Sequence, residues 1–390
     1  MTRITRAATA AVLACSLALP AAGVATATTP HPTATAAVPA ARAAALPAPT
    51  GPYAVGSTIL PLVDRSRTDP WVPTADGRAL MVTLHYPATR PGGGRPAPYA
   101  TREEARLLAE QLGPGVSGDV LARTRTHSRT DARPAPGRRP LVLLSPGFSV
   151  SRWTLTHLAE DLASRGYVVA SVDHAYESYG ISLPGGRTLT CVACTALDEG
   201  GVHGSVVTST RAADMRFVLD RLTGDRPAWR YADVIDPSRI GMAGHSIGGA
   251  SAATAMVADP RIDAGINMDG SFWEELPAEG LRGRPFMMLG THDDMHLPGG
   301  VDTTWDRAWT ALDGWKRWIT VAGSEHFTFS DGPVISRHFG LPQPALPTDR
   351  AVAVTRTYVA AFFDRHLRGL PRPLLDGPSA QNPEVHFQQP

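Results

Sequence analysis

A serine between two glycines carries the clearest chemical signal in the sequence. The pattern Gly-x-Ser-x-Gly occupies residues 244–248, with Ser246 at its centre. The apolar residues 240–243 before it predict a short buried strand, and the small residues 250–257 after it predict a helix. A serine at such a strand-to-helix turn has a strained backbone and an exposed hydroxyl, and glycines two positions away avoid crowding it. We therefore expect Ser246 to act as a nucleophile.

A serine nucleophile needs a base to remove its proton, and the base needs a carboxylate to orient it. Of the 13 histidines, His326 alone combines a position just after the last predicted strand with the expected chain order of serine, acid and histidine. Two places could supply the acid. Asp269 ends the strand that follows the nucleophile helix, and Asp293 with Asp294 follows the next strand. The pattern by itself leaves both places open.

Backbone N–H groups are needed to stabilise the negative charge that develops on the ester oxygen. We expect one from Ile247, directly after the nucleophile. A second is expected from Phe148, in the loop after the strand at residues 141–145, because Pro146 in that loop has no N–H. The spacing of one further group would suit a metal ion: His292, Asp293, Asp294 and His296. A serine mechanism needs no metal, so we expect neither a metal nor another cofactor.

These residues require a scaffold that brings the ends of several strands together. Between residues 140 and 367, continuously apolar strands alternate with helices, which predicts a mostly parallel sheet with helices on both faces. Active residues in such α/β folds lie at the carboxyl ends of strands. Residues 57–63 and 79–86 alternate in polarity and predict an antiparallel edge. The expected central strands are residues 141–145, 167–173, 240–246, 262–269, 285–290 and 317–322.

Composition divides the chain into four parts. Residues 1–27 have the basic start, apolar stretch and small-residue cleavage site of a signal peptide, and residues 28–50 form an Ala/Pro/Thr-rich linker. Residues 51–370 form the catalytic domain, and residues 371–390 a polar tail. We therefore expect a secreted, extracellular protein, in which Cys191 and Cys194 form a small disulfide loop without a catalytic role rather than a zinc site. The net charge of +1 argues against nucleic acid as a partner.

Six segments, at residues 51–56, 84–87, 144–148, 172–174, 244–249 and 326–327, carry a family resemblance. They resemble the platelet-activating factor acetylhydrolase (plasma/type II) family of α/β-hydrolases, and more loosely the actinobacterial secreted lipases and cutinases. The resemblance implies an α/β-hydrolase fold, and it places the acid 23 positions after Ser246, at Asp269. A cutinase-like pattern would instead favour Asp294. Asp173 and His174 match a family-like strand end, which we interpret as structural or pocket-lining.

One departure from the family is Pro146, where many members have histidine before the glycine. An oxyanion hole uses backbone groups, so this difference should not abolish activity. The 15 residues 270–284 between two predicted strands are too few for a lid domain, so we expect an open site. The side chains expected to line an apolar acyl pocket there are Phe148, Trp153, Phe272, Trp273 and Phe327.

Together these features predict a secreted serine carboxylic-ester hydrolase that works through a Ser-His-Asp triad and a covalent acyl-enzyme. The resemblance implies short-acyl (phospho)lipid or related esters as substrates. A cutinase- or lipase-type hydrolase of longer-chain or polymeric esters is the first alternative, and a non-catalytic α/β-hydrolase binding scaffold is the second. The helix expected at residues 102–112 has an apolar face that could touch a lipid surface transiently, although packing on its own domain is commoner. The oligomeric state is not predicted.

Overall fold

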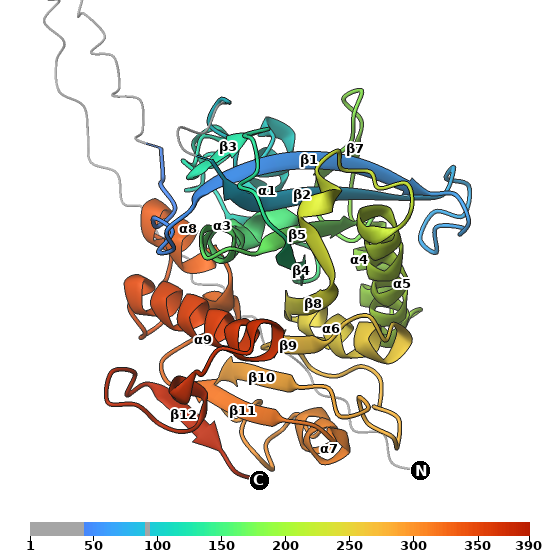
Figure 1. The fold of residues 1–390 in the computed structure, drawn as a ribbon. Coiled ribbons are helices and arrows are strands. Elements are labelled where there is room, and N and C mark those ends of the chain that lie inside the picture. Colours follow the sequence, from blue (N-terminus) through green and yellow to red (C-terminus); the bar gives the residue numbers. More distant parts are fainter. Residues whose placement is uncertain (1–42, 90–93) are drawn as a thin grey trace, which may run out of the picture. The chain divides into compact units, whose positions relative to one another are not determined.

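Strands and helices alternate along most of the chain, and most of the strands join one extended sheet (Figure 1). The computed structural model describes residues 43–89 and 94–390. In this part of the chain the main sheet has ten strands in the order β12-β11-β10-β9-β8-β4-β5-β2-β1-β3, and β6 and β7 form a separate small sheet. The predicted signal peptide and residues 28–42 of the predicted linker lie outside the described residues.

The centre of the sheet is parallel, as the sequence predicts. Six strands run in the same direction there: β4 (Arg139–Ser145), β5 (Val168–His174), β8 (Ile235–His245), β9 (Ala264–Met268), β10 (Phe286–Thr291) and β11 (Lys316–Val321). The parallel direction places their carboxyl ends at one edge, where active residues of α/β folds gather. The predicted antiparallel edge is also present, with β1 (Ala54–Asp64) paired to β2 (Arg78–Ala88) and β2 to β5. The α/β prediction is therefore confirmed.

Two apolar cores lie on opposite faces of this sheet, because neighbouring strand residues point to opposite sides. In β4, Leu141 and Leu143 face one core while Val142 and Leu144 face the other. The first core is covered by α5 (Gly204–Thr223), α6 (Ile247–Ala258) and α7 (Thr304–Ala311), and the second by α3 (Thr156–Ser164) and α9 (Thr348–Arg368) (Figure 1). These two layers clamp the central strands and hold their carboxyl ends in a fixed register.

Shorter elements surround this frame. They are α1 (Arg102–Leu112), α2 (Gly118–Ala122), α4 (Val192–Asp198), α8 (Gly332–Phe339), β3 (Ser128–Thr130), β6 (Ile181–Ser182), β7 (Thr188–Leu189), β12 (Val385–Gln388), and the 3₁₀ helices η1 (Arg152–Leu155), η2 (Ala232–Val234), η3 (His326–Phe329) and η4 (Pro373–Leu375). Helix α1 begins at a capping box formed by Thr101 and Glu104. Its apolar face, with Ala105 and Leu108, packs against Trp153 and its neighbours, so the chain itself covers that face.

The folded unit extends beyond both expected boundaries. Residues 43–50, expected in the linker, pack on the domain: Leu46 is buried, and Arg356 donates hydrogen bonds to the carbonyls of Pro47 and Ala48. The expected polar tail is also structured, since β12 pairs antiparallel with β11 and Leu375 is buried. Composition does not reveal such long-range contacts. No described helix is long and apolar enough to cross a membrane.

Candidate active site

The turn between β8 and α6 has the strained geometry that the Gly-x-Ser-x-Gly pattern predicts. Ser246 lies at φ 56° and ψ −132°, a conformation that L side chains rarely adopt. A Cβ on Gly244 would lie 2.1 Å from the backbone of Gly248, and a Cβ on Gly248 would lie 2.3 Å from the carbonyl oxygen of Ser145. Larger residues would therefore push apart the strand, the helix and the neighbouring loop. The glycines let the chain turn sharply enough to present the Ser246 hydroxyl.

Three predicted residues meet at the carboxyl ends of the strands. The Nε2 atom of His326 lies 2.9 Å from Oγ of Ser246, and its Nδ1 atom lies 2.7 Å from Oδ2 of Asp269. Ser246 follows β8, Asp269 follows β9, and His326 begins η3 after β11. Asp269 is buried, whereas the side chain of His326 is 45% exposed. His326 can thus contact both the buried carboxylate of Asp269 and a substrate in the solvent-facing pocket.

The other acid candidates have different surroundings, since Nδ1 of His326 pairs with Asp269. Asp293 accepts a hydrogen bond from Nδ1 of His296 at 2.8 Å. Asp294 is exposed, and within residues 43–89 and 94–390 its carboxylate has no hydrogen-bond partner. His292 contacts Thr320 instead. No group of three or more His, Cys, Asp or Glu side chains among the described residues could hold a metal ion.

Asp269 is held as an ionised acceptor. Its Oδ1 atom accepts the N–H of Thr291 at 2.6 Å, and Nδ1 of His296 lies 3.7 Å from the same oxygen. Burial alone would raise the pKa of Asp269, but the hydrogen bond with His326 and the nearby imidazole of His296 more than offset it, so the pKa lies below its ordinary value. The carboxylate therefore accepts Nδ1–H of His326, which leaves Nε2 free to take the proton of Ser246.

Sequence reasoning missed the two histidines that support this group. His296 was considered only for a metal site, and its closeness to Asp269 depends on how the turn after β10 folds back. His245 was not assigned a role, although Nε2 of His245 lies 2.6 Å from the backbone oxygen of His326. Its position beside the nucleophile places it in the site, but no local pattern predicts its partner.

The two predicted oxyanion amides border the same pocket as Ser246. Phe148 and Ile247 both line this pocket, and neither backbone N–H donates a hydrogen bond to another described residue. The residue after Phe148 anchors the loop. The N–H of Ser149 donates to the carbonyl of Glu177, and the carbonyl of Ser149 accepts from the N–H of Tyr179. The two N–H groups are thus available to a negatively charged oxygen near Ser246.

The pocket around Ser246 has a volume of about 380 Å³, and its wall combines apolar side chains with the polar triad. Apart from Phe148 and Ile247, its large apolar side chains are Leu197, Trp273 and Met295. Trp273 and Met295 remain partly exposed at 40% and 41%, so the pocket has an apolar, solvent-facing rim. This composition suits the acyl or alcohol part of an ester.

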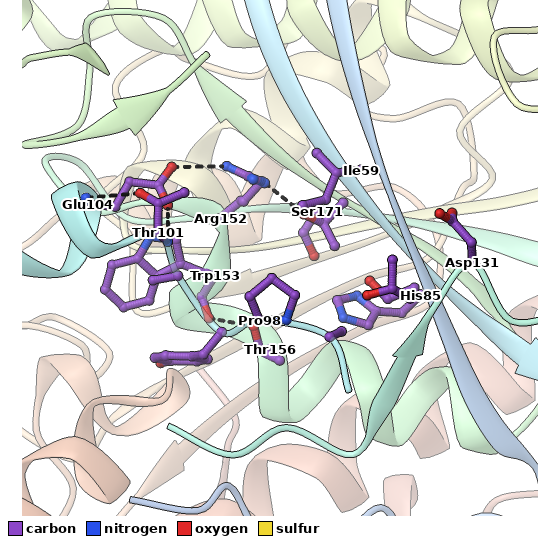
Figure 2. A pocket seen from close by; sticks show the side chains of 16 residues that line it. Ile59, His85, Pro98, Thr101, Glu104, Asp131, Arg152, Trp153, Thr156 and Ser171 are labelled. Carbon is purple, nitrogen blue, oxygen red and sulfur yellow. Dashed lines mark hydrogen bonds and ion pairs between the residues drawn. The ribbon is translucent and has the colours of Figure 1, made fainter. Parts of the chain in front are cut away.

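Of the five aromatic residues expected to line this pocket, Phe148 and Trp273 do so. Phe272 is buried and packs against Phe286 and Trp305 instead. Trp153 faces a separate cavity of about 260 Å³ that it shares with Arg152 and His85 (Figure 2). The expectation was wrong for Phe272 and Trp153, because an aromatic residue near a strand end can pack inward as readily as toward the site.

Phe327 takes a third position. Its ring lies 5.3 Å from that of His326 between centroids, and it lines an adjoining cavity of about 280 Å³ with Leu108 and Ile335. Phe327 therefore borders the site on the side of the base and does not line the pocket around Ser246.

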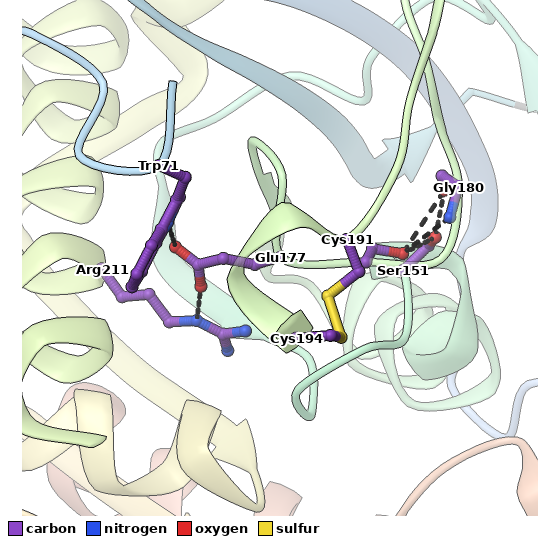
Figure 3. Close-up of a disulfide and its surroundings, with 8 residues drawn as sticks. Trp71, Ser151, Glu177, Gly180, Cys191, Cys194 and Arg211 are labelled. Carbon is purple, nitrogen blue, oxygen red and sulfur yellow. Dashed lines mark hydrogen bonds and ion pairs between the residues drawn. A yellow bond between two sulfur atoms is a disulfide. The ribbon is translucent and has the colours of Figure 1, made fainter. Parts of the chain in front are cut away.

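Cys191 and Cys194 form a disulfide, as predicted (Figure 3). The bridge lies at the start of α4, and Leu197 on that helix lines the pocket around Ser246. The sequence predicts no catalytic role for the cysteines. Their bridge nevertheless constrains a helix that forms part of the pocket wall.

A second Ser-His-Asp group lies beneath the loop that carries Phe148. Oγ of Ser145 lies 3.0 Å from Nε2 of His174, and Nδ1 of His174 lies 2.8 Å from Oδ2 of Asp214. All three side chains are at most 2% exposed, and none lines the pocket around Ser246. A substrate carbonyl has no access to Ser145 in this arrangement. The position of His174 agrees with its interpretation as structural.

Comparisons with known proteins identify the family. The family model for platelet-activating factor acetylhydrolase, isoform II, matches residues 40–183. A probable 1-alkyl-2-acetylglycerophosphocholine esterase from Arthroderma benhamiae is 30% identical and covers 88% of this chain and 93% of its own. The platelet-activating factor acetylhydrolase of Gallus gallus is 23% identical over 83% of each chain. A ferulic acid esterase structure from Streptomyces cinnamoneus is 49% identical, with a TM-score of 0.80 over 90% of this chain and all of that one. The chain therefore belongs to the platelet-activating factor acetylhydrolase, isoform II, family of α/β-hydrolases and is a carboxylic ester hydrolase.

Proposed function

We propose that the protein is a serine ester hydrolase in which Ser246, His326 and Asp269 form the catalytic triad. The observation that carries this proposal is the position of His326, whose two ring nitrogens lie 2.9 Å from Ser246 Oγ and 2.7 Å from Asp269 Oδ2 beside an open pocket. Nε2 accepts the proton as Ser246 attacks the ester carbonyl, and the amides of Ile247 and Phe148 stabilise the oxyanion.

The reaction proceeds in two halves. In the first, Ser246 Oγ forms a bond to the carbonyl carbon, and His326 returns its proton to the departing alcohol as the ester bond breaks. In the second, His326 removes a proton from water, which attacks the acyl-enzyme and releases the acid. No step requires a metal or another cofactor. Asp269 keeps His326 in the orientation and tautomer that both halves need.

For the substrate we propose short-acyl esters, including short-acyl phospholipids, because the pocket of about 380 Å³ is modest and partly open. Two relatives support this choice, one named a probable 1-alkyl-2-acetylglycerophosphocholine esterase and the other a platelet-activating factor acetylhydrolase. An aromatic acyl ester is the second candidate, because the 49% identical relative is a ferulic acid esterase and Phe148 and Trp273 offer flat apolar surfaces. Longer-chain or polymeric esters are the third.

We also propose that the protein is secreted. The basic and apolar composition of residues 1–27 supports export, and the disulfide between Cys191 and Cys194 is typical of proteins in oxidising compartments. Detection of residue 28 as the new N-terminus of protein recovered from culture medium would support the proposal. An uncleaved chain retained in the cell would contradict it.

The substrate proposal is tested with residues 28–390 and a series of esters: p-nitrophenyl acetate, butyrate and palmitate, an acetylated phospholipid, and methyl ferulate. Chelator is added in parallel, and Ser246→Ala is compared with Ser209→Ala, whose serine is exposed on α5. Rapid acetate turnover that is lost only in Ser246→Ala supports the short-acyl enzyme. Preference for ferulate favours the aromatic candidate, and preference for palmitate favours the lipase type. Equal activity of wild type and Ser246→Ala overturns the triad.

A further inference from the structure

Arg211 holds the loop that carries Phe148, the second expected oxyanion amide, through a hydrogen bond to the loop backbone. Nη1 of Arg211 donates to the carbonyl oxygen of Pro146 at 2.6 Å and lies 3.2 Å from Oγ of Ser145. Arg211 belongs to α5 and is 1% exposed. Pro146 is two residues before Phe148, so this contact fixes the peptide group immediately before the one that carries the Phe148 N–H.

The carbonyl of Pro146 also packs closely against the turn that carries Ser246. A Cβ on Gly248 would lie 2.3 Å from the oxygen of Ser145 and 2.6 Å from that of Pro146. The Pro146 carbonyl is therefore confined between the start of α6, which supplies the first oxyanion amide, and the guanidinium of Arg211. A small displacement of Arg211 would change the separation between the Ile247 and Phe148 amides.

The buried Ser145–His174–Asp214 group leaves Oγ of Ser145 able to accept a hydrogen bond from Arg211. His174 donates from Nδ1 to Asp214, so its Nε2 accepts the hydroxyl proton of Ser145, and the Ser145 oxygen can accept from Arg211. Burial and the charge of Arg211 outweigh the effect of Asp214 and lower the pKa of His174, which keeps the ring neutral. Each hydrogen bond in the series Arg211, Ser145, His174 and Asp214 therefore has one donor and one acceptor.

Glu177 completes the support of Arg211. Its Oε2 accepts from Nε of Arg211 at 2.7 Å, and its Oε1 accepts from the indole N–H of Trp71 at 2.9 Å (Figure 3). Arg78, which is fully buried, binds both Glu177 and Asp214. The guanidinium of Arg211 is thus fixed by buried partners rather than by exposed side chains.

We propose that Arg211 is a positioning residue for the oxyanion hole, acting through the Pro146 carbonyl, and that Ser145, His174 and Asp214 form its supporting hydrogen-bond chain rather than a second catalytic triad. The inference rests on the proposed function, because it assumes that Phe148 N–H stabilises the oxyanion at Ser246. Arg211 does not touch the substrate. Its effect should appear in the transition state and not in substrate binding.

The test compares Arg211→Lys and Ser145→Ala with Arg239→Lys as a control. Lysine retains a positive charge beside Glu177 but loses the planar, multiple-donor geometry of arginine. Arg239 pairs with Asp236 near the start of β8, outside the network that holds Arg211. The readouts are kcat and KM for p-nitrophenyl acetate and the affinity for a trifluoromethyl ketone, which forms a tetrahedral oxyanion on the serine.

We expect Arg211→Lys to lower kcat by about 10- to 100-fold, below the ~10²–10³ typical of losing a complete oxyanion donor. KM should change little, and the affinity for the ketone should fall in parallel with kcat. Ser145→Ala should give a smaller loss of the same kind, and it carries the test if Arg211→Lys does not fold. The control should match wild type in kcat and in ketone affinity.

Two results would overturn the inference: wild-type kcat and ketone affinity in both Ser145→Ala and any folded Arg211→Lys, or a loss confined to KM. Failure of the proposed function is distinguishable, because Ser246→Ala would then retain turnover whatever the Arg211 result. Complete inactivity of Ser145→Ala, with unchanged activity in Ser246→Ala, would make the buried group catalytic and contradict both proposals.

Discussion

Nε2 of His245 lies 2.6 Å from the backbone carbonyl oxygen of His326, so the residue before the nucleophile holds the backbone of the base. The two imidazole rings are 4.7 Å apart between centroids. Burial and the neighbouring His326 lower the pKa of His245 to about 4, so the ring is neutral at physiological pH and its Nε2–H can donate. This contact ties η3 to the end of β8 and couples the positions of Ser246 and His326.

The first prediction concerns this contact. His245→Phe keeps a flat ring but removes the donor, and we expect kcat/KM for p-nitrophenyl acetate to fall about tenfold, the effect of losing one hydrogen bond worth ~1.4 kcal/mol. His386→Phe serves as control, because His386 is exposed on β12. An unchanged kcat/KM in His245→Phe would show that the base keeps its position without this contact.

The identity of the acid gives a second prediction. Asp269→Asn should lower kcat by about 10⁴-fold, because the asparagine NH₂ can donate to Nδ1 and so favour the wrong histidine tautomer, and because a neutral amide does not stabilise the charged histidine as a carboxylate does. Asp294→Asn should match wild type, since the Asp294 carboxylate is exposed and Nδ1 of His326 pairs with Asp269. Steady-state kinetics of both variants decide the matter. Activity in Asp269→Asn together with inactivity in Asp294→Asn would support the cutinase-like assignment instead.

The strained turn leads to a third prediction. In Gly248→Ala the new Cβ would lie 2.3 Å from one backbone oxygen and 2.6 Å from another, and neither can yield as a flexible side chain could. We expect the free energy of unfolding to fall by about 1–3 kcal/mol or more. Urea denaturation measures it, with Gly115→Ala as control because no atom lies within 4 Å of a Cβ there. Equal stability of the two variants would show that the turn is not crowded.

Buried histidines give a fourth prediction, on the pH dependence of stability. Burial, with nearby arginine charge, lowers the pKa of His85 and His157 to about 3, from an ordinary value of 6.5. The unfolded chain therefore binds more protons below pH 6.5, so each neutral histidine reduces stability as the pH falls from 6.5 toward about 3. Asp331 acts in the opposite sense, because burial raises its pKa to about 8.

The contribution of one histidine is isolated by comparing His85→Phe with wild type. The free energy of unfolding of wild type should fall relative to the variant by about 1.4 kcal/mol per pH unit below pH 6.5. Urea denaturation between pH 7 and 4.5 provides the measurement. A difference between the two proteins that stays constant over this range would mean that His85 is already protonated or accessible in the fold.

The sequence predicts the parallel sheet and the approximate places of Ser246 and His326, because strand ends and chain order are local or sequential properties. The pattern leaves the acid open between Asp269 and the pair Asp293 and Asp294, and only the family resemblance favours Asp269. The sequence does not predict which side chains turn toward the pocket. Trp153 and Phe272 pack elsewhere, and Leu197 reaches the pocket from a helix that no catalytic motif marks. These positions depend on long-range packing.

The chain ends show the same limit. Residues 43–50 have the composition of a linker, yet Leu46 finds a buried site and Arg356 binds the carbonyls beside it. The support of Arg211 on the oxyanion loop is equally invisible in the sequence. It brings together residues from β4, β5 and α5 whose separation along the chain carries no pattern.

The central claim is that Ser246, and not the buried Ser145, is the nucleophile. The most direct test treats the protein with diethyl p-nitrophenyl phosphate, which phosphorylates activated serines, and maps the modified peptide by mass spectrometry. We predict one diethylphosphoryl group on Ser246, complete loss of esterase activity in proportion to labelling, and no labelling of Ser246→Ala. Labelling of Ser145, or inactivation without modification of Ser246, would contradict the account.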